Sequence, residues 1–198
     1  MRHKLLPRPG GQRGVSLIIV LLLLVIVSIL GVGAAQIATM GERSSRNDRD
    51  MQVAWQSAEA ALMDAEFDIH GPVASSRRSV FTNMANTNAF VNGCGDSGNS
   101  RGLCTLVTSG QPAWLSVDFT ATSNAHTAAY GEFTGRSFPA GTTGIQPAKA
   151  PRYVIEPIED PANRDLSGST TSYIYRVTAM GFGPRADIQG VAQIIYRD

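Results

Sequence analysis

The feature that most constrains this chain is a long apolar segment near its N-terminus. No charged residue occurs from Val15 to Gly41, and the stretch from Val15 to Leu30 consists of Leu, Ile and Val apart from Ser16 and Ser28. An uncharged helix of about 27 residues is roughly 40 Å long, which exceeds the ~30 Å hydrocarbon core of a bilayer. The segment therefore predicts a helix that crosses a membrane once.

A secretory signal peptide is the alternative interpretation of the same segment. The apolar region of such a peptide is usually about 7–15 residues long and ends in a small-residue cleavage site on its far side. Gly33, Ala34 and Ala35 have the composition of such a site. The length of the apolar run favours a retained membrane helix, and cleavage near Ala35 stays as the alternative.

The residues before the apolar segment carry the first family resemblance. All charged residues of the stretch from Met1 to Gly14 are basic, and Arg13-Gly14 directly precedes Val15. This pattern resembles the class III signal of type IV prepilins, in which a prepilin peptidase cuts after the glycine at the cytoplasmic face and methylates the new N-terminus. The resemblance implies a leader of residues 1–14, cleavage between Gly14 and Val15, and a C-terminal domain in the periplasm.

A count of basic residues on the two sides of the segment does not fix its orientation. Arg43, Arg46 and Arg49 follow the apolar stretch, so Lys and Arg are nearly balanced across it. The predicted orientation therefore depends on the resemblance of the leader.

The region from residue 42 to residue 70 has the pattern of an amphipathic helix. Apolar residues recur at spacings of three and four, and polar residues fill the other positions. The apolar set is Met51, Ala54, Trp55, Ala58, Ala61, Leu62, Ala65 and Ile69, and the polar set is Gln52, Gln56, Glu59, Asp64, Glu66 and Asp68. No proline occurs between Pro9 and Pro72, so residues 15–41 and 42–70 can form one helix. Two helices hinged within residues 41–47 are the alternative.

Both ends of the chain resemble one particular group of pilins. The residues Arg13 to Leu17 and the run Ser57-Ala58-Glu59-Ala60-Ala61-Leu62 resemble PilX-type minor pilins, and residues 151–156 and 175–183 are similar to the C-terminal region of that family. The resemblance implies a structural protein of type IV pilus assembly rather than an enzyme. The implied partners are other minor pilins, the major pilin, the prepilin peptidase and a tip adhesin, and the implied location is the inner membrane and then the pilus.

One position departs from the usual pilin pattern. If Val15 is the first mature residue, the fifth is Ile19, where most pilins carry a glutamate. In pilins that glutamate is thought to pair with the N-terminal amine of the subunit ahead, and a subunit without it resembles the minor pilins of a tip complex that primes or caps the filament. K-type pseudopilins of type II secretion share this absence and are the alternative, although they usually have a larger head with an inserted helical domain. A membrane-anchored periplasmic binding module is a further alternative.

The remainder of the chain, residues 71–198, predicts one globular head. Residues 114–119, 152–158, 172–180 and 188–196 are short and rich in β-branched and aromatic residues, with Gly and Pro between them. The last two segments are joined by a loop at residues 180–187, which predicts a hairpin. We expect an α+β, pilin-like fold with a long N-terminal helix packed on a C-terminal antiparallel sheet, while residues 72–150 contain no motif that assigns their fold.

Two cysteines, Cys94 and Cys104, enclose a short loop rich in Gly, Asn and Ser. In an oxidising periplasm they predict a disulfide that contributes roughly 2–3 kcal/mol to stability. Two free thiols in a cytosolic domain are the alternative. The spacing does not fit a zinc pair, and no cluster of histidines completes one.

The remaining patterns give no evidence for chemistry. The acidic residues Glu156, Glu159, Asp160 and Asp165 suggest either a calcium site or a solvated acidic loop, and their spacing matches no known calcium loop. No catalytic motif or phosphate-binding loop occurs, so we predict no enzyme activity, metal or cofactor. The formal net charge of +1 gives no basic surface for nucleic acid.

The leader assignment gives the first testable prediction. Expression with a prepilin peptidase is expected to yield a chain that begins at methylated Val15 and has the mass of a disulfide-bonded form, two hydrogen atoms below the reduced chain. Intact-mass and N-terminal analysis with and without the peptidase checks this. Cleavage near Ala35, or the same product in both strains, would contradict it.

Overall fold

The computed structural model describes residues 14–71, 77–82, 87–161 and 173–197. One α-helix, α1, runs without a break from Val15 to His70, so the alternative of two helices hinged within residues 41–47 is wrong. The chain forms two compact units that divide between Arg46 and Asn47, within α1.

The described part of the first unit consists of α1 up to Arg46. Its large apolar side chains are exposed, and the most apolar window of the helix has no part buried within the chain. Among the described residues, α1 is the one helix long and apolar enough to span a membrane. Such a surface is stable in lipid, because an exposed helix with this composition is strongly unfavourable in water.

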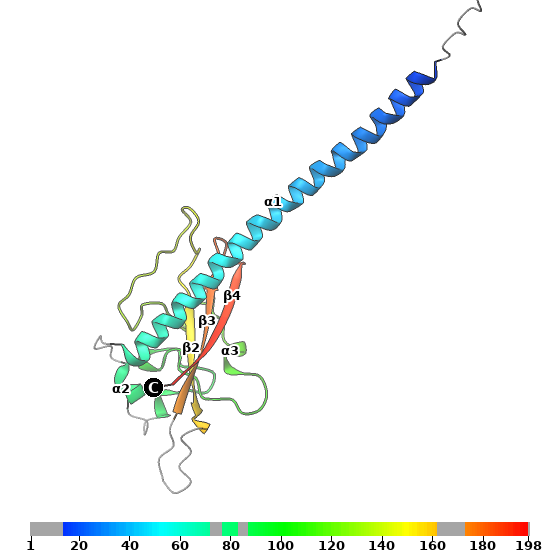
Figure 1. Ribbon diagram of the computed structural model, residues 1–198. Coiled ribbons are helices and arrows are strands. Elements are labelled where there is room, and N and C mark those ends of the chain that lie inside the picture. The colour runs from blue at the N-terminus through cyan, green and yellow to red at the C-terminus, as the bar shows by residue number, and fades with distance from the viewer. Residues whose placement is uncertain (1–13, 72–76, 83–86, 162–172, 198) are drawn as a thin grey trace, which may run out of the picture. The chain divides into compact units, whose positions relative to one another are not determined.

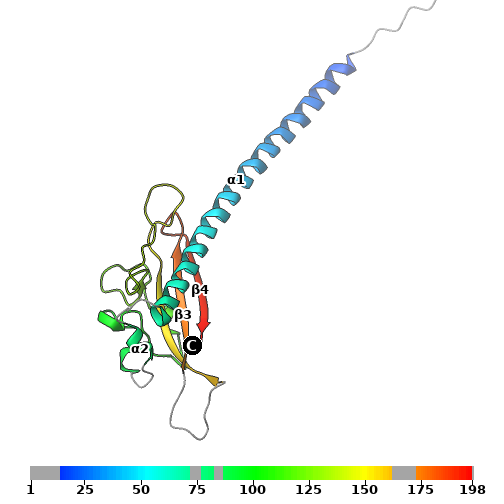
Figure 2. The ribbon, with the colours of Figure 1, turned by 60° about the vertical axis from the view of Figure 1, so that its left-hand side comes forward.

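The second unit contains a four-stranded antiparallel sheet. The strands are β1 (Ala128–Ala129), β2 (Arg152–Glu159), β3 (Tyr173–Phe182) and β4 (Gln189–Tyr196), and they lie in the order β1-β2-β3-β4. The second half of α1 lies over the three long strands (Figures 1 and 2). The predicted α+β architecture is confirmed.

Short helices and loops connect α1 to the sheet. The helices are α2 (Arg78–Thr82), the 3₁₀ helices η1 (Thr87–Ala89) and η2 (Gly98–Ser100), and α3 (Ala113–Ser116). The face of the sheet toward α1 buries Tyr153, Ile155 and Val177, and the opposite face buries Val154 together with Phe119 and the cysteines. The sheet is therefore covered on both faces.

The predicted strand at residues 114–119 is wrong, whereas the other three predicted strands are present. Residues Ala113–Ser116 form α3, which begins after Pro112. The hydroxyl of Ser116 donates to the carbonyl oxygen of Ala113 at 2.7 Å, and the amide of Leu115 donates to the carbonyl of Pro112 at 3.0 Å. Pro112 is the residue before the first helical position and has a φ of −56°, an angle that the proline ring fixes. This local geometry outweighs the aromatic and apolar composition that suggested a strand.

Small residues let α1 approach the sheet closely. Ala54, Ala58, Ala61 and Ala65 are fully buried and lie on one side of the helix because their spacing alternates between four and three. Opposite them, a Cβ added at Gly181 would collide with the backbone carbonyl oxygen of Ala54 and the amide nitrogen of Ala58. The absence of side-chain atoms on this strand position therefore sets the distance between helix and sheet.

This close approach gives a stability prediction. The Gly181→Ala variant is expected to lose about 1–3 kcal/mol of unfolding free energy, because either α1 or β3 must shift to accommodate the methyl group. Urea unfolding of the full chain in detergent, followed by tryptophan fluorescence, measures the change. Gly41→Ala is the matched control, since a Cβ there meets nothing within 4 Å. Equal stability of the two variants would contradict the packing argument.

Candidate assembly site

The predicted processing residues lie at the start of α1. Gly14 directly precedes the helix and Val15 is its first residue. Ile19 follows one turn later with 53% of its surface exposed, and all described neighbours of Ile19 along the helix up to Gly41 are uncharged. This part of α1 therefore offers only apolar contacts to a lipid or to another helix.

The end of α1 corrects one part of the sequence interpretation. Asp64 and Asp68 were expected on the polar face of the helix, but both are fully buried, whereas Trp55 from the expected apolar face is 46% exposed. A buried carboxylate is stable only when other groups compensate its charge and donate hydrogen bonds to its oxygens. The structure supplies those groups from parts of the chain distant in sequence.

Asp68 is compensated by Arg77 and Tyr153. The Nη2 atom of Arg77 lies 2.8 Å from Oδ2 of Asp68, and neither side chain is exposed to solvent. The Tyr153 hydroxyl donates to the same oxygen at 3.0 Å. Arg77 also donates through Nη1 to the carbonyl oxygen of Arg101 at 2.6 Å and stacks 3.7 Å from the ring centroid of Phe133. One arginine thus connects α1 with two loops of the head.

Asp64 is held one turn earlier by the loop that follows β1. The amide of Gly131 donates to its Oδ2 at 2.7 Å, and the Thr134 hydroxyl donates to its Oδ1 at 2.6 Å. Arg136 forms an ion pair with it at 3.7 Å, and its guanidinium lies 4.6 Å from the ring centroid of Phe67. Asp64 therefore fastens this loop to the helix.

Burial changes the acidity of both carboxyl groups. Desolvation raises the pKa of Asp68 to about 6, although Arg77 and the Tyr153 hydroxyl act in the opposite direction. Desolvation also raises the pKa of Asp64, against the hydrogen bonds from Gly131 and Thr134. The carboxylates are structural, since each is enclosed by groups of the same chain.

The predicted disulfide joins Cys94 and Cys104. The amide of Cys104 donates to the carbonyl of Ile155 in β2 at 2.9 Å, and the amide of Ile155 donates to the carbonyl of Gly102 at 2.8 Å. Arg101, inside the loop, pairs with Glu132 at 2.5 Å. The disulfide loop is therefore part of the head's core, connected to β2 and to the loop after β1.

Two of the acidic residues near the end of β2 are paired with arginines. Glu156 is fully buried and pairs with Arg176 at 2.9 Å, while Asp160 pairs with Arg197 at 2.9 Å. Asp165 lies outside the described residues. Within the described ranges, no three acidic, His or Cys side chains gather in a way that could hold a metal ion. Glu156 and Asp160 therefore each have an arginine partner from the same chain.

Comparison with known families identifies the chain. A family profile described as PilX N-terminal matches residues 13–62, and a profile described as Type IV pilus assembly protein PilX C-term matches residues 100–198. This chain belongs to the PilX family of type IV pilus assembly proteins. No curated protein and no solved structure matches it.

Membership in the PilX family establishes the general function. The protein takes part in type IV pilus assembly as a structural minor-pilin component, and its single apolar helix fits a membrane anchor. Arg77 and Cys94 lie between the two matched regions, and no periodic pattern in the sequence pairs Arg77 with Asp68. The signal that could indicate the burial of Asp64 and Asp68 is their place on the same helix face as the alanines, which the structure shows to be buried.

The acidity of Asp68 gives a pH prediction. A carboxyl whose pKa is higher in the folded than in the unfolded chain binds its proton more tightly when folded, so its contribution to stability is complete below about pH 4 and is lost as the pH rises through about 6. The unfolding free energy of the wild type relative to Asp68→Asn is expected to fall by about 3 kcal/mol over this range. Urea titrations at a series of pH values measure the difference.

The Asn variant is the control for titrating groups that are not coupled to Asp68, because it retains the shape of Asp68 without its proton equilibrium. A wild-type-minus-variant difference that stays constant from pH 4 to 7, or that grows with pH, would contradict the assignment.

Proposed function

We propose that this PilX-family protein is a minor pilin of a tip complex that primes or caps the type IV pilus. The observation that carries the proposal is Ile19, an apolar residue at the fifth mature position, in a segment without any carboxylate from Val15 to Gly41. In the pilins it resembles, a glutamate at this position pairs with the terminal amine of the subunit ahead. A subunit that lacks the glutamate has no such requirement and can be incorporated first.

The energetic argument supports the same order of assembly. A carboxylate at the centre of a membrane helix costs about 2.5–3.5 kcal/mol on insertion scales, so it persists where a partner compensates the charge. Ile19 lies about one turn from the start of α1, where this cost is smaller than at the centre, and its apolar side chain avoids it, so the subunit enters the membrane without a partner. It still offers a free amine at Val15 to the glutamate of a subunit that follows.

The arrangement in the cell follows from the leader and the helix. The peptidase removes residues 1–14 on the cytoplasmic side, residues 15–41 cross the inner membrane, and residues 42–70 join the head in the periplasm. The partners are other minor pilins, the major pilin and the prepilin peptidase. The Cys94–Cys104 disulfide supports an oxidising location for the head.

A K-type pseudopilin also lacks the glutamate and is the second candidate. Such proteins usually carry an inserted helical domain in the head. In the described ranges after α1, the longest α-helix is α2 with 5 residues. This observation favours the pilus over the type II secretion pseudopilus.

The experiment compares the wild type with Ile19→Glu and with Ile18→Glu. Epitope-tagged chains are expressed in a strain that lacks the native gene, and the tag is located by immunogold electron microscopy of sheared pili. The wild type is expected at one end of each filament in about one copy. Ile19→Glu is expected to insert normally and to appear along the shaft as well, because it acquires the missing pairing group.

Ile18→Glu is the matched control, since it carries the same insertion cost at the neighbouring position but places the carboxylate on another side of the helix. It is expected to retain the wild-type distribution. Wild-type label spread along the shaft, or Ile18→Glu and Ile19→Glu with the same distribution, would overturn the tip assignment. Normal pili with a secretion defect in the deletion strain would favour the pseudopilin.

A further inference from the structure

The two edges of the sheet differ in how far other segments of the head cover them. At one edge, β1 pairs with β2 through Ala128 and Tyr153, and the disulfide loop continues the cover at Ile155. The hydrogen bonds of Ile155 with Gly102 and Cys104 satisfy the backbone there. This edge of β2 is therefore closed over much of its length.

The opposite edge, formed by β4, has no such cover from the described residues. β4 is the last strand in the order and pairs only with β3. The amide of Gly183 donates to the carbonyl of Ile188 at 2.8 Å, and the register continues from this pair without a bulge to Tyr175 and Tyr196. Because hydrogen-bonded pairs alternate with non-bonded pairs, the outward N–H and C=O groups belong to Gln189, Val191, Gln193 and Ile195.

The devices by which proteins usually protect a strand edge are missing from β4. The strand is 8 residues long and contains no charged residue and no proline. Ile194 is 45% exposed and Ile195 is 59% exposed, one on each face of the sheet. A long, regular, uncharged edge with exposed apolar residues is a template for the addition of another strand.

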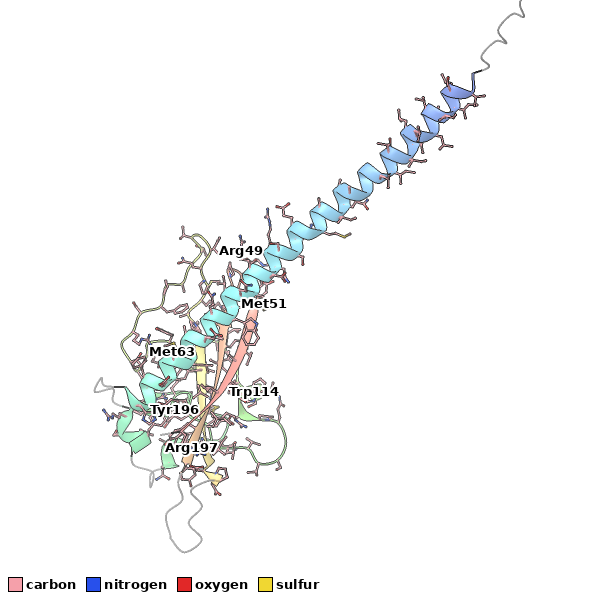
Figure 3. All side chains as sticks on the ribbon, in the orientation of Figure 1. Arg49, Met51, Met63, Trp114, Tyr196 and Arg197 are labelled. Atoms are coloured by element: carbon pink, nitrogen blue, oxygen red, sulfur yellow. A yellow bond between two sulfur atoms is a disulfide. The ribbon has the colours of Figure 1, made fainter. Side chains whose placement is uncertain are left out.

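An acidic flank of α1 lies beside this edge. The Tyr196 hydroxyl lies 3.3 Å from Oε1 of Glu66, and a Cβ at Gly190 would lie 3.2 Å from the backbone nitrogen of Trp55. Glu59 is exposed and lies on the same side as Glu66, two turns apart. No Lys or Arg occurs between Met51 and His70. In Figure 3, Met51 lies near the start of β4 and Tyr196 near its end, so this flank follows the strand.

We propose that β4 is a docking edge for an extended segment of a different protein, which adds to the sheet as a fifth strand beside β4. The segment is uncharged except for a Lys or Arg on the side facing α1, where it meets Glu59 and Glu66. Backbone hydrogen bonds to Val191, Gln193 and their neighbours give the affinity, and the acidic flank selects the basic side chain. This assignment goes beyond the tip proposal and does not depend on the position of the subunit in the filament.

A second copy of this chain is a poor occupant of the edge. Antiparallel pairing of two β4 strands about a twofold axis would reverse the direction of one α1 helix relative to the other. It would also place the two acidic flanks near a shared interface, and α1 holds no Lys or Arg between Met51 and His70 to separate their charges. Like charges at that interface oppose the pairing of two copies, so the partner is a different chain.

The test uses the full-length, isotope-labelled protein in detergent micelles and a defined peptide. The probe is a blocked octapeptide of alternating Thr and Val with one central Lys, and hydrogen exchange is followed at individual amides by NMR. Saturating peptide is expected to slow exchange at Val191, Gln193 and Ile195 by about tenfold. A peptide with Glu in place of Lys is expected to bind about threefold more weakly at low salt.

Two controls separate strand addition from apolar adhesion. The same peptide with two adjacent central amides N-methylated is expected not to bind, because neither of its edges is intact. Gln193→Pro removes one outward N–H and is expected to lose the protection, whereas Gln193→Ala removes the same side-chain bond to Thr178 and retains it. The peptide control keeps the test valid if the proline variant does not fold.

Three results would overturn the proposal. They are the absence of slowed exchange at the solubility limit of the Lys peptide, equal protection by the N-methylated peptide, and tighter binding of the Glu peptide than of the Lys peptide. Protection of the same amides without peptide, increasing with protein concentration together with a doubled mass, would identify a second copy as the occupant and would also overturn it.

Discussion

Two carboxylates buried on the last turns of α1 determine how the rest of the head packs. Asp64 and Asp68 have no access to solvent, so their charges require partners from the protein itself. Those partners come from Arg77, from Tyr153 in β2 and from the loop after β1. Removing one partner would leave a buried charge uncompensated, whereas removing an exposed pair such as Arg46 and Glu42 changes little. The ionic contacts therefore specify which segments meet at the helix, while the four buried alanines on one side of α1 allow the close packing.

One helix is built for two environments, and its composition changes accordingly. Up to Gly41 its surface consists largely of Leu, Ile and Val with no cover from the described part of its own unit. Beyond Asn47 its inner side includes four fully buried alanines, and Gly181 of β3 and Gly190 of β4 lie close to the first of them, Ala54. Large side chains suit lipid and neighbouring helices, because they maximise apolar contact without a fixed partner. Small side chains suit a fixed partner, because they let two backbones approach.

The sequence predicts the features that depend on local pattern. The apolar run, the proline-free stretch up to Pro72 and the alternating segments after Arg152 predicted α1 and the three long strands, and the short loop between the cysteines predicted the disulfide. It did not predict the burial of Asp68 or the partner role of Arg77. A carboxylate on a helix has the same local pattern whether water or an arginine faces it, and that difference arises only when distant segments meet. The prediction of a strand at residues 114–119 was wrong because a helical turn begins after Pro112, and the composition of this segment does not indicate that turn.

Among the described residues, other segments cover both faces of the sheet and the β2 edge but not the β4 edge, which is consistent with a subunit that binds a partner at β4. The β2 edge is closed by β1 and by a loop that a disulfide holds in place, and both faces of the sheet are packed. An edge that merely faced water would be expected to carry a charge or a proline, because an uncharged edge pairs with any available strand. β4 carries neither and instead has acidic side chains beside it on α1, which discriminate among incoming strands without blocking the backbone. Selective pairing is therefore a better explanation of this edge than neutral drift of an exposed surface, and it gives the head a means of recognition that the apolar helix does not provide.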